Sequence, residues 1–514
     1  MPSLPSLYNT LTRRVEPLEP LRPGEVSVYC CGVTAYDVPH IGHARAALLP
    51  DLLVRRLRRL GQKVTYVRNV TDVDDKILAR AQKNGEEPLE LSSRMALVYQ
   101  NEMRAIGCVD PDHEPRVSGH LAEIVELISK LVERGSAYVV DMPGEKRDVY
   151  FAVRSFPGYG KLSRRRIDDL VAGARVELGE EKRDPLDFAL WKGASPDEWG
   201  WESPWGRGRP GWHIECSAMS TRYLGQPFDV HTGGMDLIFP HHENEIAQSE
   251  SAHPECGPLA RTWLHNGFLD IDKEKMSKSL GNSVTLGELL RRNDPEGFRY
   301  FLLGVHYRGP IHFDSQKLPD GRVVFPGVDE AERRTDYLFS LVERLAVLAA
   351  AEITVVARPI PELVQMMKQV EKALADAEAG LDDDLNTPVA LAALGEMARH
   401  GHELADLAHK RRKDDVFAGA AGAAATRMYG AVERIASQLG LLQSTPAEYR
   451  ARTRERRLRL RGLTAEDIDQ KVAERTEARA DKDFARGDAL RAELAALGVS
   501  LHDGANGTGW TIEQ

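Results

Sequence analysis

The chain has 514 residues, of which 42% are hydrophobic and 28% are charged, and its net charge is −10 at pH 7. This length exceeds what one hydrophobic core organises, so about three domains are expected, with a composition ordinary for globular protein. Any nucleic acid would have to be held by local basic patches. No run is apolar enough to span a bilayer, the first residues do not resemble a signal peptide, and the five cysteines suggest no disulfide framework. We therefore expect a cytoplasmic protein with reduced thiols and no membrane partner.

The first pattern along the chain is a strand, a helix and a second strand. Residues 26–31 form a short apolar run that ends at Gly32, leucines recur at helical spacing within residues 44–60, and residues 63–70 form another β-like run. Such a βαβ unit requires a parallel sheet. The sequence therefore predicts an α/β domain built on parallel strands.

Polar residues follow both predicted strands. Because ligands bind at the carboxyl ends of parallel strands, these residues are expected around one crevice. They are Cys31, Gly32, the stretch His40-Ile-Gly-His43, and Thr71. The histidine stretch begins the predicted helix, where free amides and the helix dipole attract phosphate. Alone the pattern is weak, since a histidine at a helix start more often has no catalytic role.

The middle of the chain changes character twice. Residues 80–135 have helical periodicity, whereas residues 136–200 contain two β-like runs with turn residues and are interpreted as an insertion. Residues 228–230 are predicted as a strand, with His231-Thr-Gly-Gly234 as a glycine-rich turn after it. A second set of strand ends would then bring further side chains to the crevice. These are Trp212, which could instead be core packing, Cys216, His231 and Asp236.

The stretch Pro240-His-His-Glu-Asn-Glu245 carries metal-ligand chemistry. Proline is well suited to the first turn of a helix, and residues four apart share a helix face, so His241 and Glu245 project together. An imidazole and a carboxylate held in this way can be two ligands of a metal. Thiolates would complete a zinc site best, and the candidates are Cys31 and Cys216. The competing interpretation is a solvated polar helix face.

A second charged motif, Lys275-Met-Ser-Lys278-Ser279, follows a predicted strand at residues 262–269. Two lysines on a loop that bears serine and glycine can form a mobile clamp for phosphate, because the ammonium group is a compact charge on a flexible stem. An ordinary charged surface loop is the alternative.

Helical periodicity dominates the last third of the chain. Residues 327–350, 361–380, 388–408 and 420–442 predict a helical bundle. Residues 450–461 are strongly basic, either as a solvated helix face or as a surface that faces RNA. Two more helices are expected within residues 468–497, and two closing strands at residues 499–501 and 509–512.

The motifs together carry a family resemblance. HIGH near the N-terminus with KMSKS much later is the ordered pair that marks class I aminoacyl-tRNA synthetases. With Cys31, the stretch 211–219 (GWHIECSAM) and the stretch 239–245 (FPHHENE), the chain resembles the cysteinyl-tRNA synthetases over almost its whole length. It departs from their usual pattern at Val33, where proline is common, and at Thr232, where a third glycine is common.

The resemblance implies a role for each motif residue. The zinc ligands would be Cys31, Cys216, His241 and Glu245, with one zinc ion per chain. ATP, together with Mg²⁺, would be handled by His40, His43, Lys275 and Lys278. The amino acid would be surrounded by Gly32, Thr34, Thr71, Trp212 and His231, with Asp236 beside them.

The resemblance also implies the domain order. A Rossmann-like parallel-sheet catalytic domain would comprise residues 1–135 and 201–260, interrupted by a connective insertion at 136–200. The KMSKS loop and a stem-contact region would occupy 261–320. A helical bundle at 321–442 and a small mixed α/β C-terminal domain at 443–514 would bind the tRNA anticodon stem and loop, with Asp503 and Trp510 as weaker candidate contacts.

The implied function is ATP-dependent charging of tRNA(Cys) with L-cysteine by a monomeric enzyme. Zinc would distinguish cysteine from serine, because it prefers a soft thiolate to a hydroxyl, so no editing domain is expected. The strongest alternative is the cysteine ligase that modifies glucosaminyl-inositol in mycothiol synthesis, which shares the catalytic core but lacks a full C-terminal domain. A non-catalytic RNA-binding module derived from a synthetase is the other alternative, although the motifs are intact.

Overall fold

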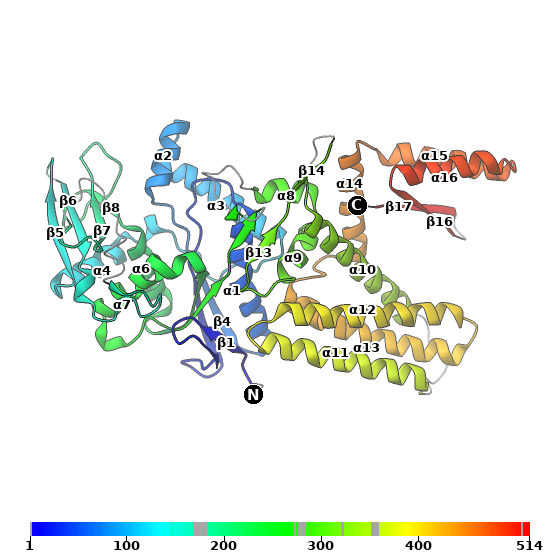
Figure 1. Ribbon diagram of the computed structural model, residues 1–514, viewed down its shortest axis with the longest axis horizontal. Helices are drawn as coiled ribbons and strands as arrows, with labels where there is room; N and C mark the ends of the chain where they lie inside the picture. Colours follow the sequence, from blue (N-terminus) through cyan, green and yellow to red (C-terminus); the bar gives the residue numbers. More distant parts are fainter. Residues whose placement is uncertain are drawn as a thin grey trace. The chain divides into compact units, whose positions relative to one another are not determined.

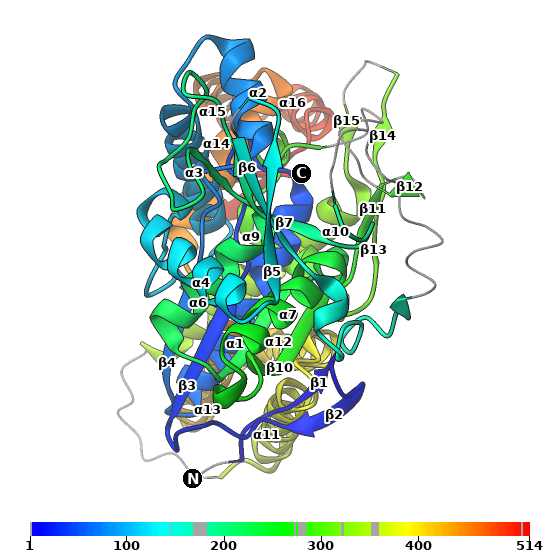
Figure 2. The same cartoon turned by 90° about the vertical axis from the view of Figure 1, so that its left-hand side faces the viewer.

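The computed structural model describes residues 3–144, 146–167, 182–271, 274–275, 284–319, 323–350, 359–504 and 507–513. The chain forms two compact units. Unit 1 comprises Met1–Leu286, Leu303–His312 and Asp376–Leu391, and unit 2 comprises Gly287–Leu302, Phe313–Ala375 and Ala392–Gln514. The elements of both are drawn in Figure 1 and, turned by 90°, in Figure 2.

Unit 1 is built on a four-stranded parallel sheet in the order β10-β9-β3-β4. The strands are β3 (Glu25–Cys30), β4 (Lys63–Arg68), β9 (Phe228–Gly234) and β10 (Ala260–Asn266). Val28 of β3 lies opposite Tyr66 on one side and Val230 on the other, and all three are buried. Burial on both faces explains the continuous apolar runs that predicted these strands.

Helix α1 (Ile41–Arg59) connects β3 to β4, which confirms the predicted βαβ unit. Leucines along one side of α1 are buried against the sheet, and the basic last turn suits the negative end of the helix dipole. Arg45 in the first turns is also buried. Its guanidinium donates to the carbonyls of His306, Tyr307 and Gly309, so the segment Leu303–His312 is fixed to this helix.

The predicted helical stretch at residues 80–135 consists of α2 (Asp75–Asn84), α3 (Pro88–Ala105), the short turn Val117–Gly119 and α4 (Leu121–Glu133). Gly85 ends α2 in the left-handed region, with φ of 69°, which a glycine adopts without strain. The N-terminal hairpin of β1 (Ser6–Asn9) and β2 (Arg14–Pro17) was not among the predicted elements. Its strands have four residues each, which is too short for a periodic signal.

The insertion is a four-stranded antiparallel sheet in the order β5-β6-β7-β8. It contains β5 (Ala137–Met142), β6 (Lys146–Phe151), the turn Val153–Ser155, β7 (Phe188–Gly193) and β8 (Gly208–Pro210). The two β-like runs predicted in this stretch correspond to β5 and β6, which pair with each other in antiparallel fashion. The sheet extends beyond residue 200, because β8 pairs with β7 through Pro210 and Trp191.

Two local predictions around β9 are wrong. The expected glycine-rich turn at 231–234 is the last part of β9, because Gly233 and Gly234 continue the ladder opposite His265 and Asn266 of β10. The helix expected to start at Pro240 is α7 (Glu243–Ala252), which begins three residues later, after the turns Met235–Leu237 and Ile238–His242. Phe239 has extended backbone angles within the second turn, which delays the helix.

The remaining elements of unit 1 lie before residue 286, except for one strand near residue 312. They are α6 (Trp212–Leu224), the turn Pro254–Cys256, β11 (Leu269–Ile271), β12 (Glu274–Lys275) and β13 (Ile311–Phe313). Strand β11 pairs with β12, and the three strands form a small sheet in the order β12-β11-β13.

Unit 2 is mostly helical, as the periodicity predicted. Its early elements are α8 (Leu286–Arg292), α9 (Pro295–Leu303), β14 (Gln316–Lys317) and β15 (Val323–Val324). The bundle comprises α10 (Pro326–Ala349), α11 (Pro361–Asp382), α12 (Thr387–Lys410) and α13 (Asp415–Leu439), and α11, α12 and α13 run side by side (Figure 1). The end of α11 and the start of α12 fall within Asp376–Leu391, which belongs to unit 1. The last part contains α14 (Pro446–Arg461), α15 (Ala465–Ala480), α16 (Phe484–Ala496) and the antiparallel pair β16 (Val499–Gly504) and β17 (Gly507–Ile512).

These helices agree with the predicted ranges to within a few residues, apart from α13, which begins five residues before the predicted range. In the ranges that the structure describes, no helix is both long and apolar enough to cross a membrane.

Candidate active site

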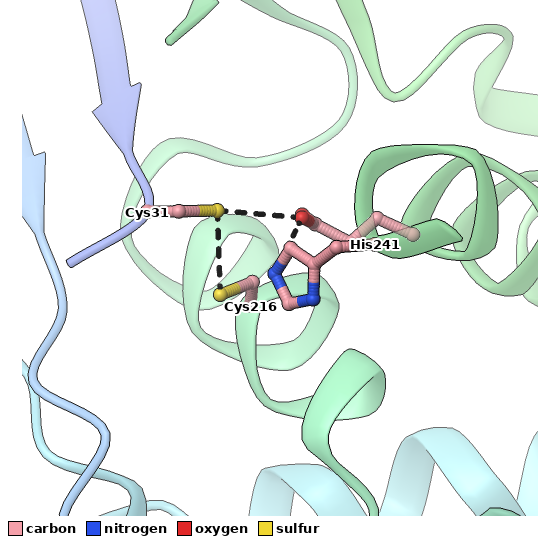
Figure 3. Close-up of side chains that lie close together, drawn as sticks. Cys31, Cys216 and His241 are labelled. Carbon is pink, nitrogen blue, oxygen red and sulfur yellow. Dashed lines mark hydrogen bonds and ion pairs between the residues drawn. The ribbon is translucent and has the colours of Figure 1, made fainter. Parts of the chain in front are cut away.

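Four side chains that could bind a metal meet at the carboxyl end of the parallel sheet. Cys31 directly follows β3, Cys216 lies on α6, and His241 and Glu245 lie on the turn and helix that follow β9. Their ligand atoms all lie within 4.8 Å of one another. The sulfur of Cys31 is 3.6 Å from that of Cys216 and 3.4 Å from Oε1 of Glu245. Figure 3 shows the two sulfurs directed toward each other beside the ring of His241.

The electrostatics of this cluster suit a bound cation. Burial raises the pKa of the Cys31 thiol well above its ordinary value, and the sulfur of Cys216 adds to that effect. For Cys216 the hydrogen bond with Cys31 lowers the pKa, but burial and the Glu245 carboxylate raise it by more. Burial lowers the pKa of His241 to about 3, so its ring is neutral and keeps a lone pair at neutral pH.

The carboxylate of Glu245 is ionised despite its position. Burial by itself would raise its pKa, but the His231 ring, whose Nε2 lies 2.9 Å from Oε2, is the main influence that holds it below its ordinary value. A buried anion and two buried sulfurs need a positive partner to be stable as charges. The donor set of two sulfurs, one imidazole and one carboxylate therefore fits zinc.

A second possible ligand set overlaps the first. Cys31, His231, His242 and Glu245 also place their ligand atoms within 4.8 Å of one another. The two sets share Cys31 and Glu245 and differ in whether Cys216 or a second imidazole contributes. Zinc favours the set with two thiolates, since soft sulfur ligands suit it best.

Three further histidines orient the cluster, and sequence analysis did not select them. Nδ1 of His213 lies 3.0 Å from Nδ1 of His241, so Nε2 of His241 is directed at Oε1 of Glu245, 3.1 Å away. Nδ1 of His242 lies 2.7 Å from Nε2 of His265, whose Nδ1 in turn lies 2.8 Å from the hydroxyl of Thr10. His213 and His242 stand next to predicted residues in the motifs, which was the available signal, whereas nothing marked His265.

Next to the cluster, two backbone segments approach each other closely. The amide of Gly32 donates to Oδ1 of Asn69 over 2.8 Å. A Cβ atom on Gly32 would lie 1.5 Å from the backbone oxygen of Asn69, so only glycine fits there. The backbones of Thr34 and Thr71 form an isolated parallel β-bridge, and the Thr71 hydroxyl donates to the Glu215 carboxylate over 3.1 Å.

The other predicted pocket residues have different environments. Trp212 begins α6 and has its ring centroid 4.4 Å from that of His241, and at 40% exposed it is not a core residue. His231 is fully buried beside Glu245. Asp236 is exposed, and its side chain lies close to Gly234. A Cβ atom added to Gly234 would lie 2.4 Å from Oδ1 of Asp236.

The HIGH stretch forms the start of α1. His40 is the N-cap residue: its Nδ1 accepts from the amide of Gly42 over 3.1 Å, and Nδ1 of His43 accepts from the amide of His40 over 3.0 Å. The two rings stack with centroids 3.9 Å apart. Both imidazoles are thus held side by side at the start of the helix.

Backbone pairing fixes the chain on both sides of the KMSKS stretch to other segments of unit 1. Lys275 lies in β12 opposite Asp270 of β11. After the loop, Val284 accepts from the amide of Ile41, and the amide of Leu286 donates to Pro39. The segment that follows the motif therefore pairs with the HIGH stretch. Lys278 itself lies outside the described residues.

Residues 17–322 match the family described as tRNA synthetases class I (C) catalytic domain, and residues 361–443 match the DALR domain. The cysteine–tRNA ligase of Anaeromyxobacter sp. (strain K) is 49% identical over 510 residues, which cover 99% of each chain, and that of Alkalilimnicola ehrlichii is 46% identical with the same coverage. Methionyl-tRNA synthetase of Mycobacterium tuberculosis, solved with methionyl-adenylate, has a TM-score of 0.62 at 16% identity, covering 86% of this chain and 94% of its own.

The parallel sheet, the HIGH stretch at its helix start and the matched catalytic domain define a class I aminoacyl-tRNA synthetase fold. The likeness to the methionyl enzyme shows that fold alone. Almost half of the residues are identical to those of cysteine–tRNA ligases over 99% of the chain. The chain therefore belongs to the family of cysteine–tRNA ligases.

The contact between Gly32 and Asn69 yields a prediction. Gly32→Ala should lower the melting temperature and the affinity for the amino acid, because the added methyl must displace the backbone of Asn69. The matched control is Gly119→Ala, where a Cβ atom would meet nothing within 4 Å. Calorimetry and amino-acid titration of both variants measure the difference, and equal behaviour of the two would contradict the close approach.

Proposed function

We propose that the chain charges tRNA(Cys) with L-cysteine in two steps: cysteine reacts with ATP to give cysteinyl-adenylate and diphosphate, and the cysteinyl group is then transferred to the tRNA 3′ end with release of AMP. The observation that carries the proposal is the cluster of two thiols, one imidazole and one carboxylate beside Gly32. Relatives with the printed name cysteine–tRNA ligase that match over 99% of the chain support it.

In the first step the chain positions two anions. The cysteine carboxylate is already ionised at neutral pH and attacks the α-phosphorus without a general base. Catalysis then depends on orientation and on stabilisation of phosphate charge. His40 and His43 at the start of α1, with Lys275 and Lys278 of the KMSKS stretch, are the proposed phosphate contacts. Mg²⁺ accompanies ATP, held mainly by phosphates and water.

Zinc is the proposed resident metal, held by Cys31, Cys216, His241 and Glu245. A zinc ion held by these residues would supply a Lewis acid for which a thiolate is a better ligand than a hydroxyl, which would favour cysteine over serine. A hydrophobic pocket alone would separate such near-isosteres only about 10²-fold. The chain's own contribution is orientation: His213 and His231 fix the ring of His241 and the carboxylate of Glu245.

Unit 2 is the proposed binding region for the tRNA anticodon stem and loop, with Asp503 and Trp510 as contacts. The match of residues 361–443 to the DALR domain supports this assignment. The described C-terminal elements α14 to β17 also favour the tRNA enzyme over the glucosaminyl-inositol ligase, which lacks a full C-terminal domain. A monomeric state and a cytoplasmic location stay predictions.

The function is tested by two assays on the purified full chain. We expect ATP–pyrophosphate exchange that requires cysteine, proceeds with serine more than tenfold more slowly, and is followed by charging of a tRNA(Cys) transcript. Activity on glucosaminyl-inositol without tRNA charging would favour the mycothiol-type ligase. Absence of cysteine-dependent exchange from folded, metal-replete protein would favour the non-catalytic module.

The choice between the two ligand sets gives a separate prediction. We expect one zinc ion per chain, a large loss of zinc in Cys216→Ser and His241→Ala, and retention in His242→Gln, because the two-thiolate set excludes His242. Elemental analysis after gel filtration, with circular dichroism to confirm folding, makes the measurement. Retention by Cys216→Ser with loss in His242→Gln would assign the metal to the other set.

A further inference from the structure

The basic run on α14 is mostly committed to contacts within unit 2. Arg452 pairs with Asp294 over 2.7 Å and with Glu296 over 3.0 Å. Arg456 and Arg457 both pair with the fully buried Glu332, and Arg457 also pairs with Asp336 over 2.7 Å. These arginines point inward, so neither a solvated helix face nor an RNA-facing surface describes them.

The exposed arginines of α14 are also engaged, with one exception. Arg450 pairs with Glu343, and Arg459 donates to the carbonyl of Arg291 over 2.9 Å. Arg454 is exposed and makes no ion pair with any residue that the structure describes. Its guanidinium instead lies over the ring of Trp510, 3.6 Å from the centroid. Arg454 thus keeps an unmatched positive charge on a flat aromatic support.

That support is itself held in place. The indole Nε1 of Trp510 donates to Asp469 over 2.6 Å, and Trp510 lies on β17, whose Ile512 carbonyl accepts from Arg457 over 3.2 Å. The side chains of Arg454 and Trp510 are therefore pre-positioned, which lowers the entropy lost when a ligand binds them.

Arg454 and Trp510 line a groove of about 790 Å³ between α10, α14 and β17, all within unit 2. Its α10 side presents Tyr337, which is 44% exposed and whose ring centroid lies 4.1 Å from that of His402. Two acidic groups also line the groove: Asp336 accepts from Tyr449 and pairs with Arg457, whereas Glu513 accepts from a neutral hydroxyl, that of Ser500. The groove thus combines aromatic faces with the guanidinium of Arg454, which makes no ion pair with a described residue.

This combination fits a nucleotide. A planar base stacks on aromatic side chains, and a phosphate pairs with a guanidinium, whereas the net charge of −10 provides no general attraction for RNA. We propose that the groove between α10, α14 and β17 binds one unstacked nucleotide of the tRNA, with its phosphate on Arg454 and its base against Tyr337. The inference rests on the proposed function and names an additional contact for its tRNA substrate.

The test compares two substitutions on the same helix. Arg454→Ala should raise the KM for a tRNA(Cys) transcript about tenfold and reduce the slope of log affinity against log salt by about 0.7, the share of one single-stranded phosphate. Cysteine-dependent ATP–pyrophosphate exchange should not change. Arg459→Ala removes the same charge from an exposed arginine five residues away and should change the KM for tRNA by less than twofold.

A second pair tests the stacking surface. Tyr337→Phe keeps the ring and should bind tRNA as the unsubstituted protein does, whereas Tyr337→Ala should weaken binding several-fold. The melting temperature of each variant confirms folding. The inference is overturned if Arg454→Ala retains the original KM and salt slope. Failure of the unsubstituted protein to charge tRNA would instead overturn the proposed function.

Discussion

The account depends on one constraint: ionisable side chains are confined together where little water reaches them. Cys216, His241 and Glu245 are buried, the sulfur of Cys31 faces them, and all four ligand atoms lie within 4.8 Å. Unpaired charges in such a place are costly, so the arrangement is stable either with neutral thiols or with a cation. Gly32 follows Cys31 directly, so the cluster adjoins the close approach of Gly32 and Asn69.

The fold explains why residues so distant in sequence converge. Parallel strands deliver their carboxyl ends to one edge, so the residue after β3 and those after β9 meet. This much follows from sequence, because a βαβ pattern and strand-end motifs define the edge. Local geometry does not follow as readily. The glycines at 233 and 234 signalled a turn, yet pairing with β10 keeps them in a strand, since tertiary contacts override local preference.

The same contrast separates what sequence predicts about the site from what it misses. Motif residues such as His241 and Glu245 were identified because their spacing has a chemical meaning. His265 was missed, because a histidine on a strand carries no signal until the structure places it 2.7 Å from His242. On α14 the composition indicated a basic surface, but burial directs Arg456 and Arg457 inward to Glu332, and only the structure distinguishes them from Arg454. The composition of α14 predicts a positive charge, but the contacts of each arginine determine whether that charge is available to a ligand.

The absorption spectrum of the protein loaded with Co²⁺ shows whether this cluster binds a metal through its sulfurs and responds to cysteine. The account predicts the intense visible bands of a tetrahedral ion, with thiolate charge-transfer absorption that strengthens when L-cysteine is added and stays unchanged with L-serine. A spectrum without thiolate charge transfer, or an equal response to the two amino acids, would contradict the assignment of this cluster as the centre that selects the substrate by its sulfur.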